Sequence, residues 1–191
     1  MTNCSPPLQQ TLTPTAIKSI SIPVSGLLVG SLNARSINNK SATITNLIDE
    51  LKLDVLAIQE SWHENSDALS LRSCVPPGYA VVDAARAPAC DSSDVVGMRA
   101  VAGGGVAVIY RAEYKMHKVT TLPTAKTFEF VCCRLSAGSR GDVILLSAYR
   151  PGSKSITNAF FDEWTTLLES LVTFRCPLLV LGVGDLNIHL E

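Results

Sequence analysis

The sequence has few charged residues and no excess of either sign. Only 17% of its 191 residues are charged, below the ~25% of an average globular protein. Sixteen basic residues against 17 acidic ones give a net charge of −1, so no global positive field attracts nucleic acid. Such a partner has to be indicated by local motifs. A hydrophobic share of 47% excludes a disordered chain, because enough apolar residues are present to form a core.

Long hydrophobic runs, a leader pattern and paired cysteine motifs are missing as well. The longest nearly uncharged apolar stretch, Ala100 to Tyr110, contains three glycines and is too short for a membrane helix of ~18 or more residues. The first residues, MTNCSPPLQQTLTPT, lack the basic and apolar regions of a secretory signal. The six cysteines form no CxxC pair, which argues against a zinc site or a disulfide framework. We therefore expect an intracellular protein, nuclear or cytoplasmic, without a membrane partner.

The chain does contain a regular succession of short apolar runs bounded by turn residues. Two longer segments, about 41–52 and 157–174, repeat apolar residues with the 3.6-residue period of a helix. Strand–helix–strand order at both ends of the series predicts an α/β fold, with two β-sheets packed as a sandwich and flanked by helices. The seven predicted strands are 27–33, 54–59, 79–83, 105–111, 128–136, 142–148 and 178–182.

The same patterns indicate the domain boundaries. Residues 1–24 are rich in Pro, Ser and Thr without periodicity, so we expect a flexible N-terminal segment before one domain that spans residues 25–191. The polar, aperiodic stretch 84–102 predicts a long surface loop within this domain.

Four of the predicted strands end in polar side chains. In open α/β sheets, ligands bind outside the carboxyl ends of the strands, so these positions are candidates for a site. A single residue of this kind is more often a helix cap or a solvated loop residue, and only the combination points to chemistry. The residues are Asn33, Glu60, Tyr149, Arg150, Asp185 and Asn187.

Six motifs stand in a characteristic order along the chain: LNARS, DVLAIQES, GGGVAVIYR, FEFVCCRL, LLSAYRPG and VGDLNIH. Their order and spacing resemble the endonuclease/exonuclease/phosphatase superfamily. Within it, residues 26–191 are most similar to the apurinic-type endonuclease domain of LINE-type (non-LTR) retrotransposons. The resemblance implies a four-layer α/β sandwich and a hydrolase of phosphodiester bonds that uses Mg²⁺ or Mn²⁺ and nicks DNA. It also implies fusion to a reverse transcriptase in the full-length protein.

The resemblance further implies a role for most of these residues. Glu60, in the QES motif, is the expected metal ligand, and Asp185, in GDLN, is the expected water-activating carboxylate. Asn187 and Asn33 are expected to contact phosphate, with Asn33 also orienting the metal ligand. Tyr149 is expected to place its phenol near the scissile phosphate. Mg²⁺ prefers oxygen ligands, usually one or two carboxylates with water and substrate phosphate, which agrees with this assignment.

Two more residues complete the predicted site. Arg150 is predicted to bind substrate, because a guanidinium can hold a phosphate through two hydrogen bonds, although Arg before Pro-Gly is equally often a turn residue. Glu129, at a position that the family often fills with Glu, is expected to lie behind the residues that touch the substrate.

One feature departs from the family pattern. The terminal Ser-Asp-His motif of the family is not found in the 191 residues, and His63, His117 and His189 do not stand in such a context. We therefore expect an incomplete domain, with the last part of the fold missing, that aggregates on its own because a sheet edge is left exposed. Two alternatives stay open: a catalytically inactive fragment of such a domain, and a phosphatase of the same superfamily.

Overall fold

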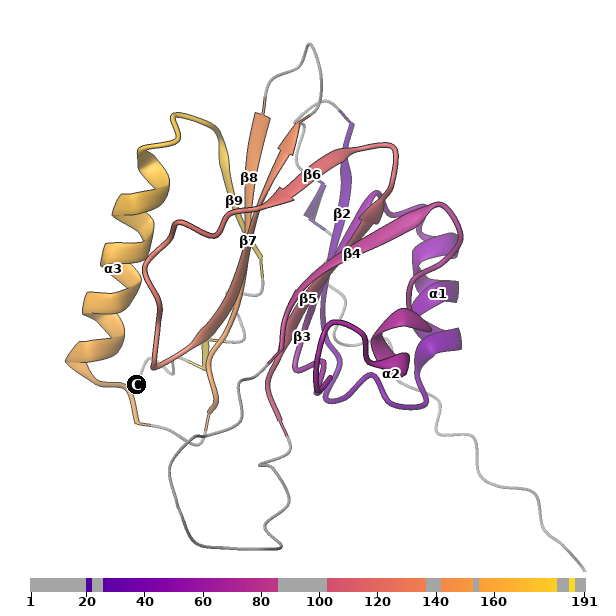
Figure 1. Cartoon of the computed structure of the whole chain (residues 1–191), viewed down its shortest axis with the longest axis horizontal. Helices are drawn as coiled ribbons and strands as arrows, with labels where there is room; N and C mark the ends of the chain where they lie inside the picture. Colours follow the sequence, from indigo (N-terminus) through magenta and orange to yellow (C-terminus); the bar gives the residue numbers. More distant parts are fainter. Residues whose placement is uncertain are drawn as a thin grey trace, which may run out of the picture.

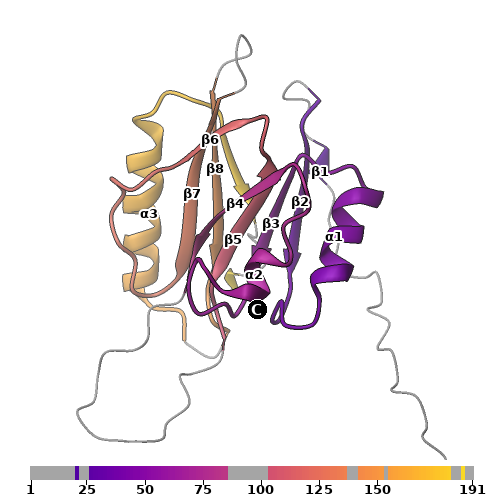
Figure 2. The same ribbon diagram turned by 45° about the vertical axis from the view of Figure 1, so that its right-hand side comes forward.

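The computed structural model of the chain describes residues 20–21, 26–85, 103–136, 142–152, 155–181 and 186–187. In these ranges the strands form two β-sheets that pack face to face. Figure 1 shows helices on the outer side of each sheet, and the turned view of Figure 2 shows the same layers. The predicted α/β fold, a two-sheet sandwich flanked by helices, is therefore confirmed.

Five of the described strands make up the first sheet: β1 (Ile20–Ser21), β2 (Leu28–Asn33), β3 (Val55–Gln59), β4 (Tyr79–Ala84) and β5 (Val106–Arg111). Their order across the sheet is β1–β2–β3–β5–β4. Helix α1 (Ser41–Glu50) joins β2 to β3, and such a crossover places the two strands parallel. Their last residues, Asn33 and Gln59, therefore lie side by side at one edge of the sheet.

Four of the described strands make up the second sheet: β6 (Lys115–Lys118), β7 (Glu129–Ser136), β8 (Asp142–Tyr149) and β9 (Leu178–Leu181). Their order is β6–β7–β8–β9, with β7 and β8 antiparallel. Helix α3 (Asn158–Val172) joins β8 to the parallel strand β9. Each sheet thus contains one strand–helix–strand unit, as the sequence predicts.

Side chains alternate along the central strands and form three apolar layers. In β3, Val55 and Ala57 face the second sheet, whereas Leu56 and Ile58 face the helices of the first sheet. Strand β8 shows the same alternation, with Tyr149 on its inner face. Because successive side chains of a strand point to opposite faces, a strand that is covered on both faces is almost entirely apolar.

Three described elements have no counterpart among the predictions: β1, β6 and the short helix α2 (Leu69–Arg72). In β6 only Met116 is buried, so its sequence shows no apolar alternation. Strand β1 pairs Ile20 with Val29 and falls within the segment 1–24 for which the sequence predicts flexibility. Most of the predicted loop 84–102 lies outside the described residues.

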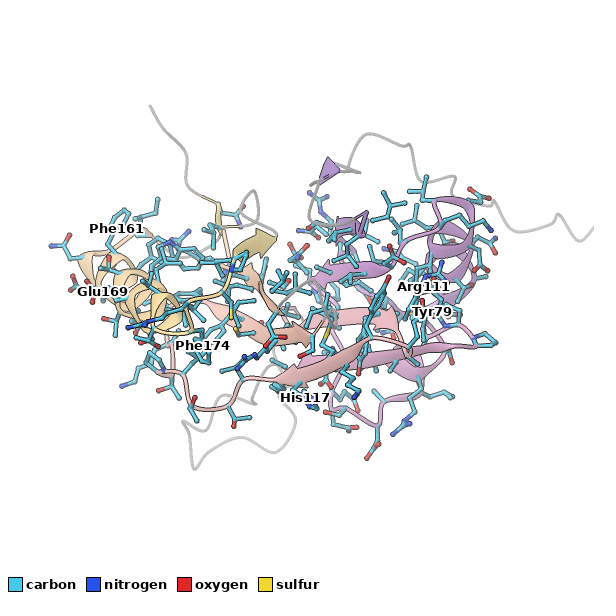
Figure 3. All side chains as sticks on the ribbon, turned by 90° about the horizontal axis from the view of Figure 1, so that it is seen from above. Tyr79, Arg111, His117, Phe161, Glu169 and Phe174 are labelled. Carbon is cyan, nitrogen blue, oxygen red and sulfur yellow. The ribbon has the colours of Figure 1, made fainter. Side chains whose placement is uncertain are left out.

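Helix α3 covers the second sheet with aromatic side chains. Phe160 is only 1% exposed, and its ring packs edge-on against Phe128 with 5.8 Å between the ring centroids. Its neighbour Phe161 is 49% exposed. Figure 3 shows Phe161 and Tyr79 on opposite sides of the molecule, the former on α3 and the latter on the first sheet. Within the described ranges, no helix combines the length and apolar character needed to cross a membrane.

The neighbouring phenylalanines of α3 provide a matched test of this packing. We expect Phe160→Ala to lower the free energy of unfolding by about 3–5 kcal/mol, because it removes a large buried ring and leaves a cavity. Phe161→Ala loses one exposed edge-to-face contact and is expected to cost at most about 1.5 kcal/mol. Urea denaturation of the two variants measures both values. Equal losses would contradict the assignment of Phe160 to the core.

Candidate functional site

Asn33 and Glu60 meet at the carboxyl ends of two parallel strands. The side-chain Nδ2 of Asn33 donates a hydrogen bond of 2.7 Å to Oε1 of Glu60. Oδ1 of the same amide accepts the backbone N–H of Arg35 at 3.1 Å, which fixes the orientation of the amide. The structure therefore brings the predicted metal ligand and its predicted orienting residue into direct contact.

The backbone around Glu60 is strained. Glu60 and Trp62 have φ angles of 52° and 55°, in the left-handed region that residues other than glycine rarely adopt. Such a conformation costs on the order of 1–3 kcal/mol for each residue and persists only where the surroundings hold it. Here the carbonyl of Glu60 accepts the N–H of Ser36 at 2.7 Å, and the N–H of Trp62 donates to the carbonyl of Gly104 at 2.8 Å.

A buried hydrogen bond joins the two sheets at the same end of the sandwich. Nε2 of Gln59 donates to Oγ of Ser147 at 2.8 Å, and both residues are fully buried. The carbonyl oxygen of the Gln59 side chain accepts the hydroxyl of Ser31 at 3.2 Å. Because Gln59 precedes Glu60 and Ser147 comes two residues before Tyr149, the carboxyl ends of β3 and β8 lie at one edge. Glu60 and Tyr149 therefore belong to the same end of the molecule.

Glu129 and Tyr149 form a cross-strand pair on the second sheet. Oε2 of Glu129 accepts the backbone N–H of Gly105, which precedes β5 of the first sheet, at 2.5 Å. Tyr149 is 7% exposed and packs in the layer between the sheets. Glu129 thus connects the second sheet to the loop that supports Trp62. The expected place of Glu129 behind the residues that contact substrate stays a prediction.

The side chains of Arg150 and Asn187 each donate a hydrogen bond to a backbone carbonyl of the other residue. Arg150 is 1% exposed, and its Nη1 donates to the carbonyl oxygens of Leu186 at 3.2 Å and Asn187 at 3.4 Å. Nδ2 of Asn187 donates to the carbonyl of Arg150 at 2.6 Å. The guanidinium also lies 5.5 Å from the ring centroid of Phe160. Arg150 therefore positions the segment that carries Asn187, while its contact with substrate phosphate stays a prediction.

The fit of these residues to a divalent cation rests on the Glu60 carboxylate. A magnesium ion commonly takes one or two carboxylates and completes its shell with water and substrate oxygens. An oriented carboxylate at a strand end, held by Asn33, matches that requirement. Among the described residues, no three His, Cys, Asp or Glu side chains gather into a larger set of ligands. The predicted carboxylate Asp185 lies outside the described residues.

The polar residues that connect the parts of this edge are not among the candidates predicted from the sequence. Gln59 ends an otherwise apolar strand and Ser147 lies within an apolar run, and these polar positions were a usable signal. Ser61, His63 and Asp83 are buried polar residues joined in a row, but their pairing depends on contacts between distant segments. No local pattern of the sequence indicates it.

Comparison with known proteins assigns this arrangement to a family. The sequence model described as the endonuclease/exonuclease/phosphatase family matches residues 30–191, so the chain belongs to that family. As its description says, this family comprises endonucleases, exonucleases and phosphatases. A comparison with curated protein sequences found no match.

Solved structures share the fold at low sequence identity. The catalytic domain of human Nocturnin is 19% identical with a TM-score of 0.56 over 84% of this chain and 64% of its own. An AP endonuclease from Archaeoglobus fulgidus is 18% identical with a TM-score of 0.53, covering 81% and 55%. The endonuclease domain of TRAS1, a telomere-specific non-LTR retrotransposon, is 13% identical with a TM-score of 0.50, covering 80% and 56%. This chain spans 55–64% of the length of these three structures.

The buried cysteines are unsuited to act as nucleophiles or metal ligands. Cys74, Cys132 and Cys133 are buried and not in disulfides. Burial raises the pKa of the Cys74 thiol to about 11 and the pKa of the Cys132 and Cys133 thiols to about 12. Because the thiolate is the reactive and metal-binding form, these groups stay inert near neutral pH.

The raised pKa values predict a loss of stability in alkali. An unfolded cysteine ionises with a pKa of about 8.5, whereas Cys132 and Cys133 keep their protons in the folded chain up to a pKa of about 12. Their contribution is fully present below about pH 8.5 and is lost as the pH rises toward the folded pKa. We expect the Cys132→Ala/Cys133→Ala variant to lose less stability between about pH 7 and about pH 10 than the unmodified chain, measured by urea denaturation. Equal losses would contradict this linkage.

Proposed function

We propose that this chain is a metal-dependent endonuclease module that nicks DNA, of the kind found in LINE-type retrotransposons. The observation that carries the proposal is the Asn33–Glu60 pair, at the same end of the sandwich as Tyr149 and Glu129. Family membership supports phosphodiester hydrolysis. The motifs AYRPG and GDLNIH support the retrotransposon type, and a retrotransposon endonuclease is among the structures with this fold.

Each residue of this edge has a different role in the proposed hydrolysis. A bound Mg²⁺ supplies positive charge that offsets the charge of the non-bridging phosphate oxygens. Glu60 holds that charge in place, and Asn33 orients the Glu60 carboxylate through its amide. Asp185 accepts the proton of the attacking water. Tyr149 contacts the phosphate from the second sheet.

The backbone conformation at Asn187 is fixed by its own contacts. Its φ angle of 50° is left-handed, a conformation that Asn tolerates better than most residues. The bond from its Nδ2 to the Arg150 carbonyl, together with the bonds from the Arg150 guanidinium to the carbonyls of Leu186 and Asn187, fixes the backbone at Asn187. A Cβ at Gly152 would lie 3.1 Å from Cγ of Asn187, so Gly152 allows the amide to pack closely. The turn thereby orients Asn187 for its contact with phosphate.

Substitution of the two carboxylates tests the proposal. We expect Glu60→Gln and Asp185→Asn each to slow nicking of supercoiled plasmid by at least about 100-fold, since one removes the metal ligand and the other the general base. Glu64→Gln is the matched control, because Glu64 is an exposed carboxylate four residues from Glu60. Activity in Mg²⁺ that EDTA abolishes is expected for the unmodified chain. Nicking by Glu60→Gln at the unmodified rate would overturn the site assignment.

Other substrates separate this proposal from its alternatives. Phosphate release from inositol phosphates or nucleotides, without nicking, would identify a phosphatase instead. A chain that binds Mn²⁺ through Glu60 but hydrolyses none of these substrates would be the inactive form. Binding of Mn²⁺ is followed by electron paramagnetic resonance of the free ion.

A further inference from the structure

A row of buried hydrogen bonds starts at the residue that follows Glu60. Oγ of Ser61 lies 2.7 Å from Nδ1 of His63, and Nε2 of His63 lies 2.9 Å from Oδ2 of Asp83 on strand β4. These three residues are 0%, 4% and 8% exposed. We call Ser61, His63 and Asp83 the relay. None of them takes part in the hydrolysis proposed above.

Both ring nitrogens of His63 have a hydrogen-bond partner. An ionised carboxylate only accepts hydrogen bonds, so a neutral imidazole donates from Nε2 to Asp83 and accepts the Ser61 hydroxyl at Nδ1. Oδ2 of Asp83 also accepts the hydroxyl of Ser66 at 2.9 Å, and the Asp83 carbonyl accepts Nζ of Lys118 at 2.5 Å. The far end of the relay is therefore anchored to the edge strand of the first sheet and to β6 of the second.

The near end of the relay lies inside the strained turn. Ser61 stands between the two left-handed residues, Glu60 and Trp62. Its N–H donates to the carbonyl of Gly105 at 3.1 Å, and its carbonyl accepts the N–H of Ile37 at 3.1 Å. Ser61 thus links the two parts: its side chain bonds to His63 of the relay, and its backbone belongs to the strained turn.

Gly105 connects the relay to the other half of the site. A Cβ at Gly105 would lie 2.8 Å from Oγ of Ser61 and 3.2 Å from Nδ1 of His63, so the relay packs directly on this backbone. The Gly105 φ angle of 80° also favours glycine. Because the Gly105 N–H donates to Glu129, the relay, the Glu60 turn and the second sheet share one contact point.

We propose that Ser61, His63 and Asp83 are positioning residues that hold Glu60 in the orientation in which it binds a divalent cation. The inference rests on the proposed function, because it takes Glu60 as the metal ligand. A left-handed turn relaxes when its supports are removed, and relaxation displaces the Glu60 carboxylate from Asn33. The relay supplies a side-chain support for this turn that is independent of Asn33.

A positioning role and a merely stabilising role differ in what a variant changes. Loss of a merely stabilising cluster lowers the melting temperature but leaves the metal affinity of the folded chain unchanged. Loss of groups that orient a ligand typically lowers metal affinity by about 10–100-fold. Affinity for the metal alone, measured on folded protein, therefore separates the two roles without any requirement for catalysis.

The experiment compares four variants of the 191-residue chain, the fourth being Glu60→Gln, with Mn²⁺ alone as the probe and electron paramagnetic resonance as the readout. Ser61→Ala cuts the relay beside Glu60. His63→Asn removes the hydrogen bond to Asp83, because an asparagine amide is long enough to reach Ser61 but too short to reach Asp83. Ser66→Ala is the matched control, since it removes another hydroxyl from the same Asp83 oxygen and leaves the relay bonds in place. Melting curves of each variant establish that the measured protein is folded.

We expect Ser61→Ala and His63→Asn to weaken Mn²⁺ binding by about 10–100-fold, and Ser66→Ala to leave it unchanged. If Ser61→Ala does not melt cooperatively, His63→Asn alone decides the test. Unchanged affinity in the folded relay variants, together with lost affinity in Glu60→Gln, would overturn the relay and leave the proposed metal site intact. Unchanged affinity in Glu60→Gln would overturn the metal site, and the relay with it.

Discussion

The two halves of the candidate site lie on different sheets, and the buried hydrogen bond between Gln59 and Ser147 fixes how those sheets meet. Apolar side chains between two sheets gain similar burial in several relative positions, because the hydrophobic effect has no direction. An amide donor opposite a hydroxyl acceptor is satisfied in one position only, and a shift that leaves it unpaired costs about 1–3 kcal/mol. The placement of Glu60 and Tyr149 at the same end of the sandwich depends on this constraint.

Several departures from local preference gather at that edge. Glu60, Trp62 and Asn187 are left-handed without being glycine, and Arg150 is a buried cation. In the central strands and in helices α1 and α3 the apolar pattern of the sequence agrees with the observed structure, whereas the exposed strand β6 shows no such pattern. A sequence generally follows local rules where only stability is at stake and breaks them where geometry serves another purpose. Lys52 and Arg175, which follow helices α1 and α3, are left-handed as well, so a left-handed φ angle alone does not mark a site. What distinguishes this edge is its combination with the Asn33–Glu60 contact and the buried Arg150.

Much of the fold was predictable because its strands are long and apolar. The parallel pair β2 and β3 follows from the helix between them, and this pairing alone places Asn33 next to the end of β3. Strand β6 was not predictable, because three of its four residues are exposed. Arg150 before Pro-Gly has the sequence of a solvated turn, but Phe160 of α3 and the carbonyls of Leu186 and Asn187 surround its guanidinium in the fold.

The site was predictable as a set of residues but not as a network. Motif order identified Glu60, Asn33 and Tyr149, since each ends a strand. The contact between His63 and Asp83 spans 20 residues and requires β4 to pair with β5, so it is a consequence of tertiary structure. Polar side chains at the ends of strands are recognisable in a sequence. Hydrogen-bonded pairs of residues that are distant in the chain are not.

Electrostatics gives a reason for the proposed role of a cation at this edge. Glu60 and Glu129 both lie there, and carboxylates repel an anionic substrate at close range. The Asn33 amide and the Gly105 N–H each donate a hydrogen bond that orients one of these carboxylates. In the proposed site, a divalent cation held by Glu60 would offset the charge of the two carboxylates. Metal and phosphodiester are then expected to favour each other's binding by the same factor, because coupling between two binding equilibria is reciprocal.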